Sequence, residues 1–419
     1  MLPPWSVSPL RLLCWCQSHK GLIDQQTAPL YNDTVLNTLA IHNYRSIQNL
    51  VAPLAPLNVI TGPNGCGKSN LYRALRLLAE TARGGVINSI ASEGGLQSTF
   101  WAGPEKISRA MRKGDVPVQG GPRQDRVRLQ LGFATEEFAY SIALGLPEPS
   151  TSAFTLDPEI KRECIWAGAS YRPASALTER DGSILKIRRS RKWQVINQHL
   201  NRSESLFDHG SDLITTPEIY HLRELISGWR FYDHFRTDRE APARQPQLGT
   251  RTPVLHHDGR DVAAAIQTIR EIGEKELLDT AISDAFPGAS LDVSQSAEGL
   301  FTLRFSQTGL LRSLSGAELS DGTLRYLLLA AALLTPRPPP LIVLNEPETS
   351  LHPDLLPSLA RLILAVSKHT QVCVVSHASR LIAALEEDHN CHSIRLEKNL
   401  GQTEISGFGM LDEPLWKWP

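Results

Sequence analysis

Apolar positions near the start of the chain predict a strand, a tight turn and an amphipathic helix in direct succession. Residues 39–41 and 57–61 are short apolar runs of the kind that form strands. From residue 69 to residue 81, leucines recur at helical spacing and share one face. The strand at 57–61 therefore leads through a Gly-rich turn into a helix.

The next segment alternates apolar and polar residues. Residues 126–133 and 138–144 show this alternation, which predicts two antiparallel strands with one exposed face. The pattern is least regular over residues 146–285, although Asp181-Gly182 marks a hairpin turn. Two stretches of this segment have helical spacing, at residues 222–235 and 261–278.

Helices and strands alternate in the last third of the chain. After alternating positions between residues 291 and 305, the predicted order is helix, strand, helix, strand. Strands that alternate with helices predict a parallel sheet with crossover helices. These four elements are expected at residues 323–334, 341–344, 353–366 and 371–375.

Composition narrows the class of protein. The 419 residues are 41% hydrophobic and 21% charged with a net charge of -1, which excludes a disordered chain and a general affinity for nucleic acid. No apolar run reaches the roughly 18 residues of a membrane helix, so no membrane span is expected. Six scattered cysteines favour a reducing, cytoplasmic location over a disulfide framework.

The strongest chemical motif is a Gly-x-x-x-x-Gly-Lys-Ser loop between the strand at 57–61 and the helix after it. Glycines let the backbone N–H groups of such a loop point at phosphate oxygens, and the helix presents its positive end. The lysine reaches the β/γ-phosphates and the serine hydroxyl binds Mg²⁺. The expected nucleotide-binding residues are Gly62, Pro63, Asn64, Gly65, Cys66, Gly67, Lys68 and Ser69.

Two further candidates follow the predicted parallel strands. Glu346 comes after the strand at 341–344 and His377 after the strand at 371–375. The carboxyl ends of parallel strands meet at one sheet edge, so Glu346 could position and deprotonate the attacking water there. His377 could sense the γ-phosphate. The alternatives are a helix-capping or surface glutamate and a structural histidine.

A third candidate is the start of the helix at 323–334. Ser320, Asp321 and Gly322 precede its apolar part, and small residues at a helix start can donate hydrogen bonds to a phosphate. An ordinary N-cap would have the same sequence.

In this order, the motifs resemble the ABC-class ATPases of the SMC/RecF/OLD-like branch. Segments 41–47 and 346–353 share that resemblance, and RecF-like bacterial ATPases are similar over roughly residues 36–395. The resemblance implies an α/β P-loop NTPase fold: an ABC-type ATPase core with a mixed sheet flanked by helices, plus an α+β insertion. The implied organisation is a poorly structured leader (1–35), core lobes (36–145 and 286–395), an insertion (146–285) and a C-terminal tail (396–419).

The same resemblance implies roles for the site residues. Lys68, Glu346 and His377 would catalyse ATP hydrolysis, and Ser69 and Asn345 would hold Mg²⁺. ATP would join two chains into a homodimer. In it, Ser320 and Gly322 of one subunit would touch the γ-phosphate held by Lys68 of the other. The implied motifs are Walker A (62–69), the signature (319–323), Walker B (341–346), the D-loop (349–352) and the switch histidine His377.

Three positions depart from the family pattern or are hard to assign. Asn345 replaces the usual Asp and removes a charge beside Mg²⁺, and Asp321 replaces a Gly and adds a charge beside a phosphate; slow hydrolysis is therefore expected. Gln97 is the candidate for the Q-loop glutamine.

About 40 residues follow His377, too few for the nuclease domain of OLD-type relatives. Translation is hypothesised to begin near residue 35.

Weaker features concern partners and metals. A basic cluster beside Trp193 could contact DNA through phosphates and stacking, or could be a solvated charged face. His256-His257-Asp258 is interpreted as a turn rather than a metal site, and Cys66 as a small tolerated residue rather than an oxidation-sensitive one. The cluster comprises Lys186, Arg188, Arg189, Arg191 and Lys192.

Two functions remain open at this stage. The first is a DNA-associated ATPase in repair, maintenance or anti-phage defence. The second is an ATP-gated regulatory subunit that controls a separate effector protein without binding DNA. A transporter ATPase fits segments 41–47 and 346–353 less well.

Overall fold

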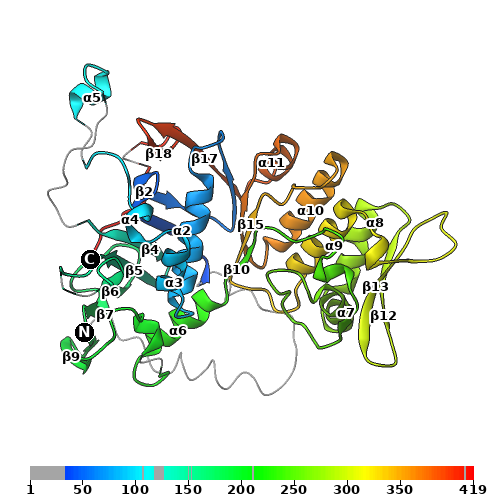
Figure 1. Cartoon of the computed structure of the whole chain (residues 1–419), viewed down its shortest axis with the longest axis horizontal. Coiled ribbons are helices and arrows are strands. Elements are labelled where there is room, and N and C mark those ends of the chain that lie inside the picture. Colours follow the sequence, from blue (N-terminus) through cyan, green and yellow to red (C-terminus); the bar gives the residue numbers. More distant parts are fainter. Residues whose placement is uncertain are drawn as a thin grey trace, which may run out of the picture.

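Helix α2 (Lys68–Thr81) lies between two sheets. The computed structural model describes residues 34–105, 108–117, 127–149, 151, 153–209, 212–409 and 412–419. Within it, α2 packs against β1 (Thr38–Tyr44) and β4 (Leu129–Ala134) of one sheet and β16 (Gln371–Val375) of the other. Helix α2 is labelled in Figure 1, and the burial of its apolar residues confirms the amphipathic helix.

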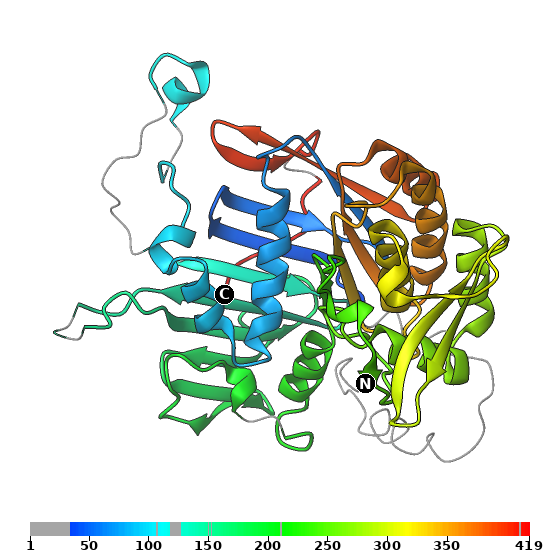
Figure 2. The same ribbon diagram turned by 45° about the vertical axis from the view of Figure 1, so that its right-hand side comes forward.

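The first sheet has eight strands, all paired antiparallel. Figure 2 shows it behind α2. The strands occur in the order β2 (Ile47–Pro53), β1, β4, β5 (Phe138–Gly145), β6 (Glu159–Ala167), β7 (Ala176–Asp181), β8 (Ile184–Arg189) and β9 (Lys192–Asn197).

Strands β4 and β5 are buried on both faces, so the exposed face expected from their alternation is wrong. One face contributes Phe133 and its neighbours to the core around α2. The other packs Ala134 and Ala139 against Trp166, and Trp416 from the end of the chain packs against this small cluster. The alternation reflects residue size here, because small residues face the two tryptophans.

The second sheet is mixed, as the resemblance implied. Its first five strands run parallel and the last is antiparallel. The strands at 341–344 and 371–375 pair in parallel, which confirms the predicted crossover arrangement. The order is β10 (Arg230–Tyr232), β15 (Leu341–Asn345), β16, β3 (Leu57–Thr61), β17 (Cys391–Asn399) and β18 (Gln402–Ile405).

Alternate residues of the parallel strands belong to two different cores. Leu341 and Val343 pack with the α2 core, whereas Ile342 and Leu344 pack with a helical layer on the other side. Strands buried on both faces explain why these segments are continuous apolar runs. The helices of the second core are α7 (Val262–Ile272), α8 (Lys275–Ala285), α9 (Asp321–Leu333), α10 (Leu356–Val366) and α11 (Ser379–Glu386).

Two helix predictions need correction. Helix α6 (Pro217–Ser227) ends before Gly228, and the rest of the stretch predicted as helix contains β10, which pairs with β15. A short buried run such as this fits a strand and a helix equally well by pattern alone. The helix expected at 261–278 is divided at Gly273 into α7 and α8.

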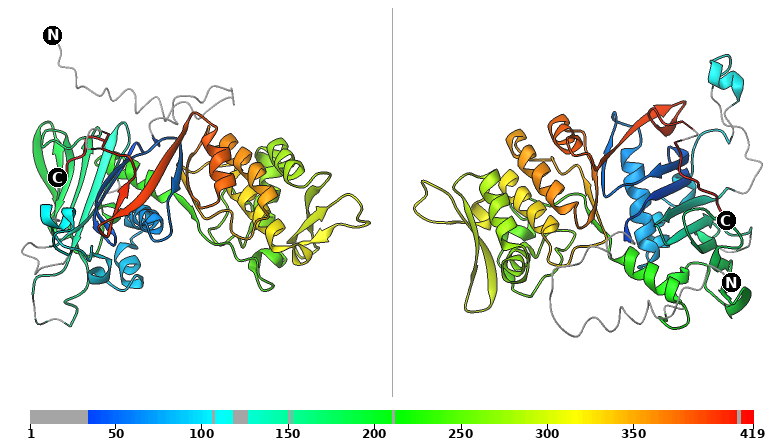
Figure 3. Two further views of the ribbon diagram at one scale, coloured as in Figure 1. Left: turned by 90° about the horizontal axis from the view of Figure 1, so that it is seen from above. Right: turned by 180° about the vertical axis from the view of Figure 1, so that it is seen from behind.

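A small third sheet stands at the far end of the helical layer (Figure 3). Its strands β12 (Ser290–Gln295) and β13 (Leu300–Ser306) confirm the alternation between residues 291 and 305. The other strands and α-helices of the described chain are β11 (Gln247–Leu248), β14 (Leu314–Ser315), α3 (Val86–Ser92), α4 (Leu96–Thr99) and α5 (Arg109–Lys113).

The sheets cross two of the expected domain boundaries. Strands β5 and β6 pair across residue 145, and β18, within the expected tail, pairs with β17. The leader at 1–35 lies outside the described residues except for its last two positions. None of the described helices is both long and apolar enough to cross a membrane.

Candidate functional site

The phosphate loop connects β3 directly to α2. Its glycines adopt backbone angles that other residues rarely adopt, with φ of +142° at Gly62, +78° at Gly65 and +113° at Gly67. A Cβ at Gly62 would lie 2.3 Å from the Leu396 carbonyl oxygen, and one at Gly67 would lie 2.2 Å from Thr403 Oγ1. The loop therefore has the curled backbone expected of a phosphate cradle.

Lys68 and Ser69 occupy the first positions of α2. The Lys68 ammonium donates to the carbonyl oxygens of Gly62, at 2.6 Å, and Pro63, at 3.3 Å, so it lies on the loop itself. The Ser69 side chain is exposed at the positive end of the helix. A cation and an exposed hydroxyl thus stand where the motif requires them.

Three side chains from outside the loop support it. Thr403, on β18, donates to the Cys66 carbonyl oxygen at 2.7 Å, and its hydroxyl lies 2.7 Å from Ser46 Oγ. Asn70 donates to the same Ser46 oxygen at 2.7 Å. Cys66 itself is 1% exposed. Its burial favours a small packed residue over an oxidation site.

The parallel sheet brings the two catalytic candidates to the same sheet edge as the phosphate loop. Asn345 and Val375 are paired, Val375 is also paired with Ile60, and Glu346 and His377 follow these strand ends. His377 Nδ1 lies 3.8 Å from Glu346 Oε1.

Glu346 has a φ of +47°, an unusual angle for a residue with a side chain. Its backbone N–H donates to the Val375 carbonyl oxygen at 2.8 Å, which fixes this turn. The side chain is 47% exposed and so accessible to water. Backbone strain of this kind is typical of functional sites.

Glu348 is a site residue that the motif analysis did not single out. Its Oε1 accepts hydrogen bonds from Ser376 Oγ, at 2.7 Å, and from the N–H groups of His377, at 2.9 Å, and Ala378, at 3.2 Å. It thereby fixes the segment that carries His377. The only sequence signal is its place two residues after Glu346.

At the signature, Ser320 is the N-cap of α9, and its Oγ accepts from the Thr323 N–H at 3.1 Å. The charge added by Asp321 has a partner, because Arg244 Nη2 lies 2.6 Å from its carboxylate. Arg244 is 7% exposed and also donates to the Leu319 carbonyl oxygen at 2.6 Å. The sequence pattern gave no indication of Arg244.

Gly322 allows the D-loop to approach α9. A Cβ there would lie 2.9 Å from the carbonyl oxygen of Ser350, which has a φ of +65°. The signature and D-loop residues line a hollow of about 610 Å³, and none of its lining residues within the described chain comes from the phosphate loop. Helix α9 belongs to the helical core and α2 to the other. One chain therefore keeps its signature apart from its own loop.

Ser69 and Asn345 fit the expected Mg²⁺ site by ligand chemistry, since hydroxyl and amide oxygens suit this ion. Asn345 is half-buried at the end of β15 and Ser69 is exposed. Gln97 lies elsewhere, in α4, and lines a cavity of about 830 Å³ that also contains Trp101 and Arg202. No residue of the phosphate loop lines that cavity among the residues described, so the Q-loop role gains no support.

The basic cluster lies on the β8–β9 hairpin at the edge of the eight-stranded sheet. Lys186 is paired with Glu179 at 2.8 Å, and Arg188 donates to the Pro173 carbonyl oxygen at 2.7 Å. Both cations also lie over the Trp193 ring, at 4.8 and 5.4 Å from its centroid. Arg189 donates to the Thr215 carbonyl oxygen, and Arg191 and Lys192 are exposed beside it. Two cations thus lie over a ring that is 37% exposed, and three more lie nearby on the same hairpin.

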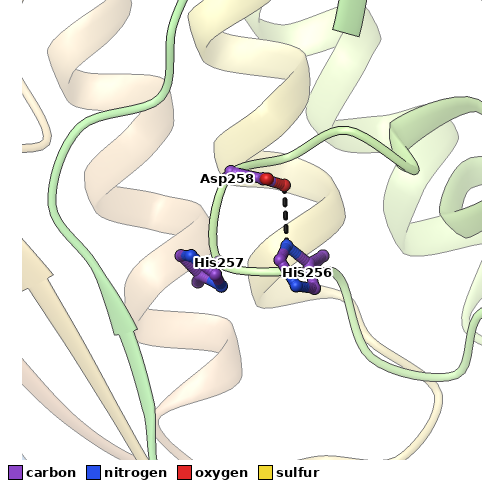
Figure 4. A group of neighbouring side chains, drawn as sticks. All are labelled: His256, His257 and Asp258. Carbon is purple, nitrogen blue, oxygen red and sulfur yellow. Dashed lines mark hydrogen bonds and ion pairs between the residues drawn. The ribbon is translucent and has the colours of Figure 1, made fainter. Parts of the chain in front are cut away.

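His256, His257 and Asp258 form a turn, as the sequence predicts (Figure 4). Their ligand atoms lie within 4.8 Å of one another. His256 Nδ1 is 2.7 Å from Asp258 Oδ1, however, and its Nε2 is 3.1 Å from Arg260 Nη2. Both ring nitrogens of His256 therefore have a partner. The positive charge of Arg260 beside them disfavours binding of a metal cation. The turn interpretation accounts for the group without an ion.

Comparisons with known proteins agree with this geometry. A family model described as "AAA domain, putative AbiEii toxin, Type IV TA system" matches residues 57–383. No curated protein matches the chain.

Similar solved structures are SMC head domains. One is an SMC head bound to the C-winged helix domain of ScpA (14% identity, TM-score 0.47, 90% of this chain and 98% of that chain). Another is the SMC head domain from Thermotoga maritima (16%, 0.44, 90% and 99%). A third is an Smc head with an extended coiled coil bound to the C-terminal domain of ScpA, derived from Pyrococcus furiosus (12%, 0.47, 88% and 95%).

Proposed function

We propose that this chain, which belongs to the AAA family that its residues 57–383 match, binds and hydrolyses ATP as an SMC/RecF-like ABC P-loop ATPase. One observation carries the proposal: adjacent strands β3, β16 and β15 bring the phosphate loop, His377 and Glu346 to one edge of a parallel sheet. Ligands bind at this edge in open α/β sheets.

Each residue has a role in the proposed reaction. The backbone N–H groups of residues 62–67 and the start of α2 would hold the phosphates, and Lys68 would leave its loop carbonyls to reach the β/γ-oxygens. Glu346 would orient a water and take its proton. His377 would contact the γ-phosphate. Mg²⁺ at Ser69 and Asn345 would neutralise charge that develops on the phosphate oxygens.

Turnover is expected to be slow because Asn345 supplies no negative charge at the metal position. The charge of Asp321 beside a phosphate was the other reason to expect slow hydrolysis. This reason is weaker in the structure, because Arg244 compensates that charge. A slow ATPase suits a switch whose ATP-bound state persists.

We further propose that two chains close around two ATP molecules. The support is the separation of the signature from the loop within one chain, together with the open hollow at Ser320 and Gly322. A second copy could supply its signature to the first copy's nucleotide, and twofold symmetry would complete both sites.

The role of the closed dimer is proposed as DNA repair, maintenance or anti-phage defence, with DNA on the β8–β9 hairpin. Its five cations and partly exposed Trp193 can bind phosphates and stack on a base. The second candidate, control of an effector protein, is favoured by exposed apolar residues. Val195 (46% exposed) and Ile196 (38%) are on β9 of the hairpin, and Ile214 (84%) precedes Thr215, which Arg189 contacts.

ATP turnover measured with and without DNA tests these functions. We expect turnover in the wild-type protein and none above background in Lys68→Ala, because that variant lacks the phosphate-binding cation. DNA should accelerate turnover several-fold, and charge reversal at Arg188, Arg189 and Arg191 should abolish the acceleration but not basal turnover. Basal turnover without any DNA effect would favour the effector role, and equal turnover in Lys68→Ala would contradict ATPase function.

A further inference from the structure

Glu348 is a buried carboxylate whose two oxygens have different surroundings. Oε1 accepts three hydrogen bonds from the segment at residues 376–378. Oε2 is buried and has no hydrogen-bond partner within the described part of the chain. The side chain is 7% exposed. A carboxylate buried to this degree needs compensation for its lost hydration.

The same carboxylate faces the imidazole of His377. Its Oε1 lies 3.3 Å from His377 Nδ1, closer than the 3.8 Å between that nitrogen and Glu346 Oε1. Both neighbours are carboxylates, which can only accept hydrogen bonds when ionised. A hydrogen on His377 Nδ1 would suit both acceptors and would leave Nε2 for another partner. A carboxylate behind a histidine fixes the tautomer and the ring orientation in this way.

Arg325 is a buried cation whose pKa is affected by the charge of Glu348. It is 2% exposed, and within the described residues it donates long hydrogen bonds of 3.3–3.4 Å to the carbonyl oxygens of Asp233, Phe235 and Glu346. Burial lowers the pKa of Arg325, and the charge of Glu348 acts in the opposite direction. Arg325 is part of α9, whose first residues carry the signature.

On the basis of the proposed ATPase function, we propose that Glu348 is the positioning residue for His377. It holds the ring with Nδ1–H toward its own Oε1, so that Nε2 is available to the γ-phosphate. Glu348 acts through His377 and does not touch the nucleotide.

A double-mutant cycle separates this role from a structural one. We expect Glu348→Gln to lower kcat at least tenfold while KM for ATP stays within twofold, because binding and folding remain intact. In a His377→Ala background, Glu348→Gln should change kcat by less than twofold. Glu387→Gln, at an exposed glutamate, is the matched control and should match the wild type. The proposal would be overturned if the decreases in kcat caused by Glu348→Gln and His377→Ala multiplied in the double variant. An unchanged kcat in Glu348→Gln would also overturn it.

A second measurement does not need turnover. Histidine ¹⁵N NMR of the nucleotide-free protein, with the His377 signals identified from His377→Ala, should show the Nδ1–H tautomer. Glu348→Gln should shift that equilibrium, because its amide can also donate to Nδ1. An Nε2–H tautomer in the wild type, or identical spectra for both proteins, would overturn the proposal. Absence of turnover in the wild type with the expected spectra would instead contradict the ATPase function alone.

Discussion

Arg244 shows how one side chain can compensate for an unusual residue in a motif. Asp321 places a carboxylate where a phosphate of a second chain is proposed to lie. The Arg244 guanidinium pairs with it at 2.6 Å and also holds the Leu319 carbonyl oxygen at 2.6 Å. The arginine thus offsets the charge and orders the turn before α9.

We predict that Arg244→Leu weakens the ATP-dependent dimer about tenfold, equivalent to about 1.4 kcal/mol, because it leaves an unpaired charge facing a phosphate. ATP binding to one chain should stay unchanged. Sedimentation velocity in a Glu346→Gln background measures the effect. Adding Asp321→Gly should restore most of the affinity, since it removes the unpaired charge. Failure of that substitution to restore the dimer would show that Arg244 acts only on folding.

Residues with a fixed motif spacing could be assigned from sequence, and residues without one could not. The structure brings Glu346 and His377 together, because each follows a recognisable apolar strand. Arg244 and Glu348 have no such local signal. Arg244 contacts Asp321, which is 77 positions away along the chain, and Glu348 contacts Ser376, which is 28 positions away. No local periodicity of the sequence indicates such distant contacts.

Among the elements, those with strong local patterns were predicted closely. The strand expected at 57–61 is β3, and the strand expected at 371–375 is β16. Residues 230–232 were misassigned because a short buried run fits either state, and pairing with β15 decides it. The double-sided burial of β4 and β5 depends on Trp416, nearly 300 residues later in the chain.

Strand β18 supports the phosphate loop through Thr403. We predict that Thr403→Val weakens ATP binding about fivefold, since the substitution keeps the shape and loses one hydrogen bond worth about 1 kcal/mol. Titration with a fluorescent ATP analogue measures this. Thr302→Val, on the distant β13, is the control and should bind normally. Equal ATP affinities for the wild type, Thr403→Val and Thr302→Val would show that β18 does not support ATP binding.

At the scale of the whole molecule, two cores share the parallel sheet. One contains α2 and the antiparallel sheet, and the other contains α7 to α11 (Figure 1). The phosphate loop and the signature are attached to different cores. The architecture therefore presents two complementary half-sites on one chain.

Acid should destabilise the fold through half-buried histidines on the sheets. Burial lowers the pKa of His42, on β1, and of His392, on β17. The unfolded chain then binds more protons than the folded one as the pH falls through about 6.5, so stability is full above that pH and decreases below it. We predict that the free energy of unfolding in urea falls between pH 7 and pH 5. The His42→Gln/His392→Gln variant should show a smaller fall; an equal or larger fall would contradict this origin.

The central claim is that ATP completes its site by joining two chains. Light scattering on Glu346→Gln, which should bind ATP without hydrolysing it, tests this most directly. We predict the mass of one chain without ATP, the mass of two chains with ATP and Mg²⁺, and one chain again when Lys68→Ala is added. A Glu346→Gln protein that binds ATP and keeps the mass of a single chain would contradict the account.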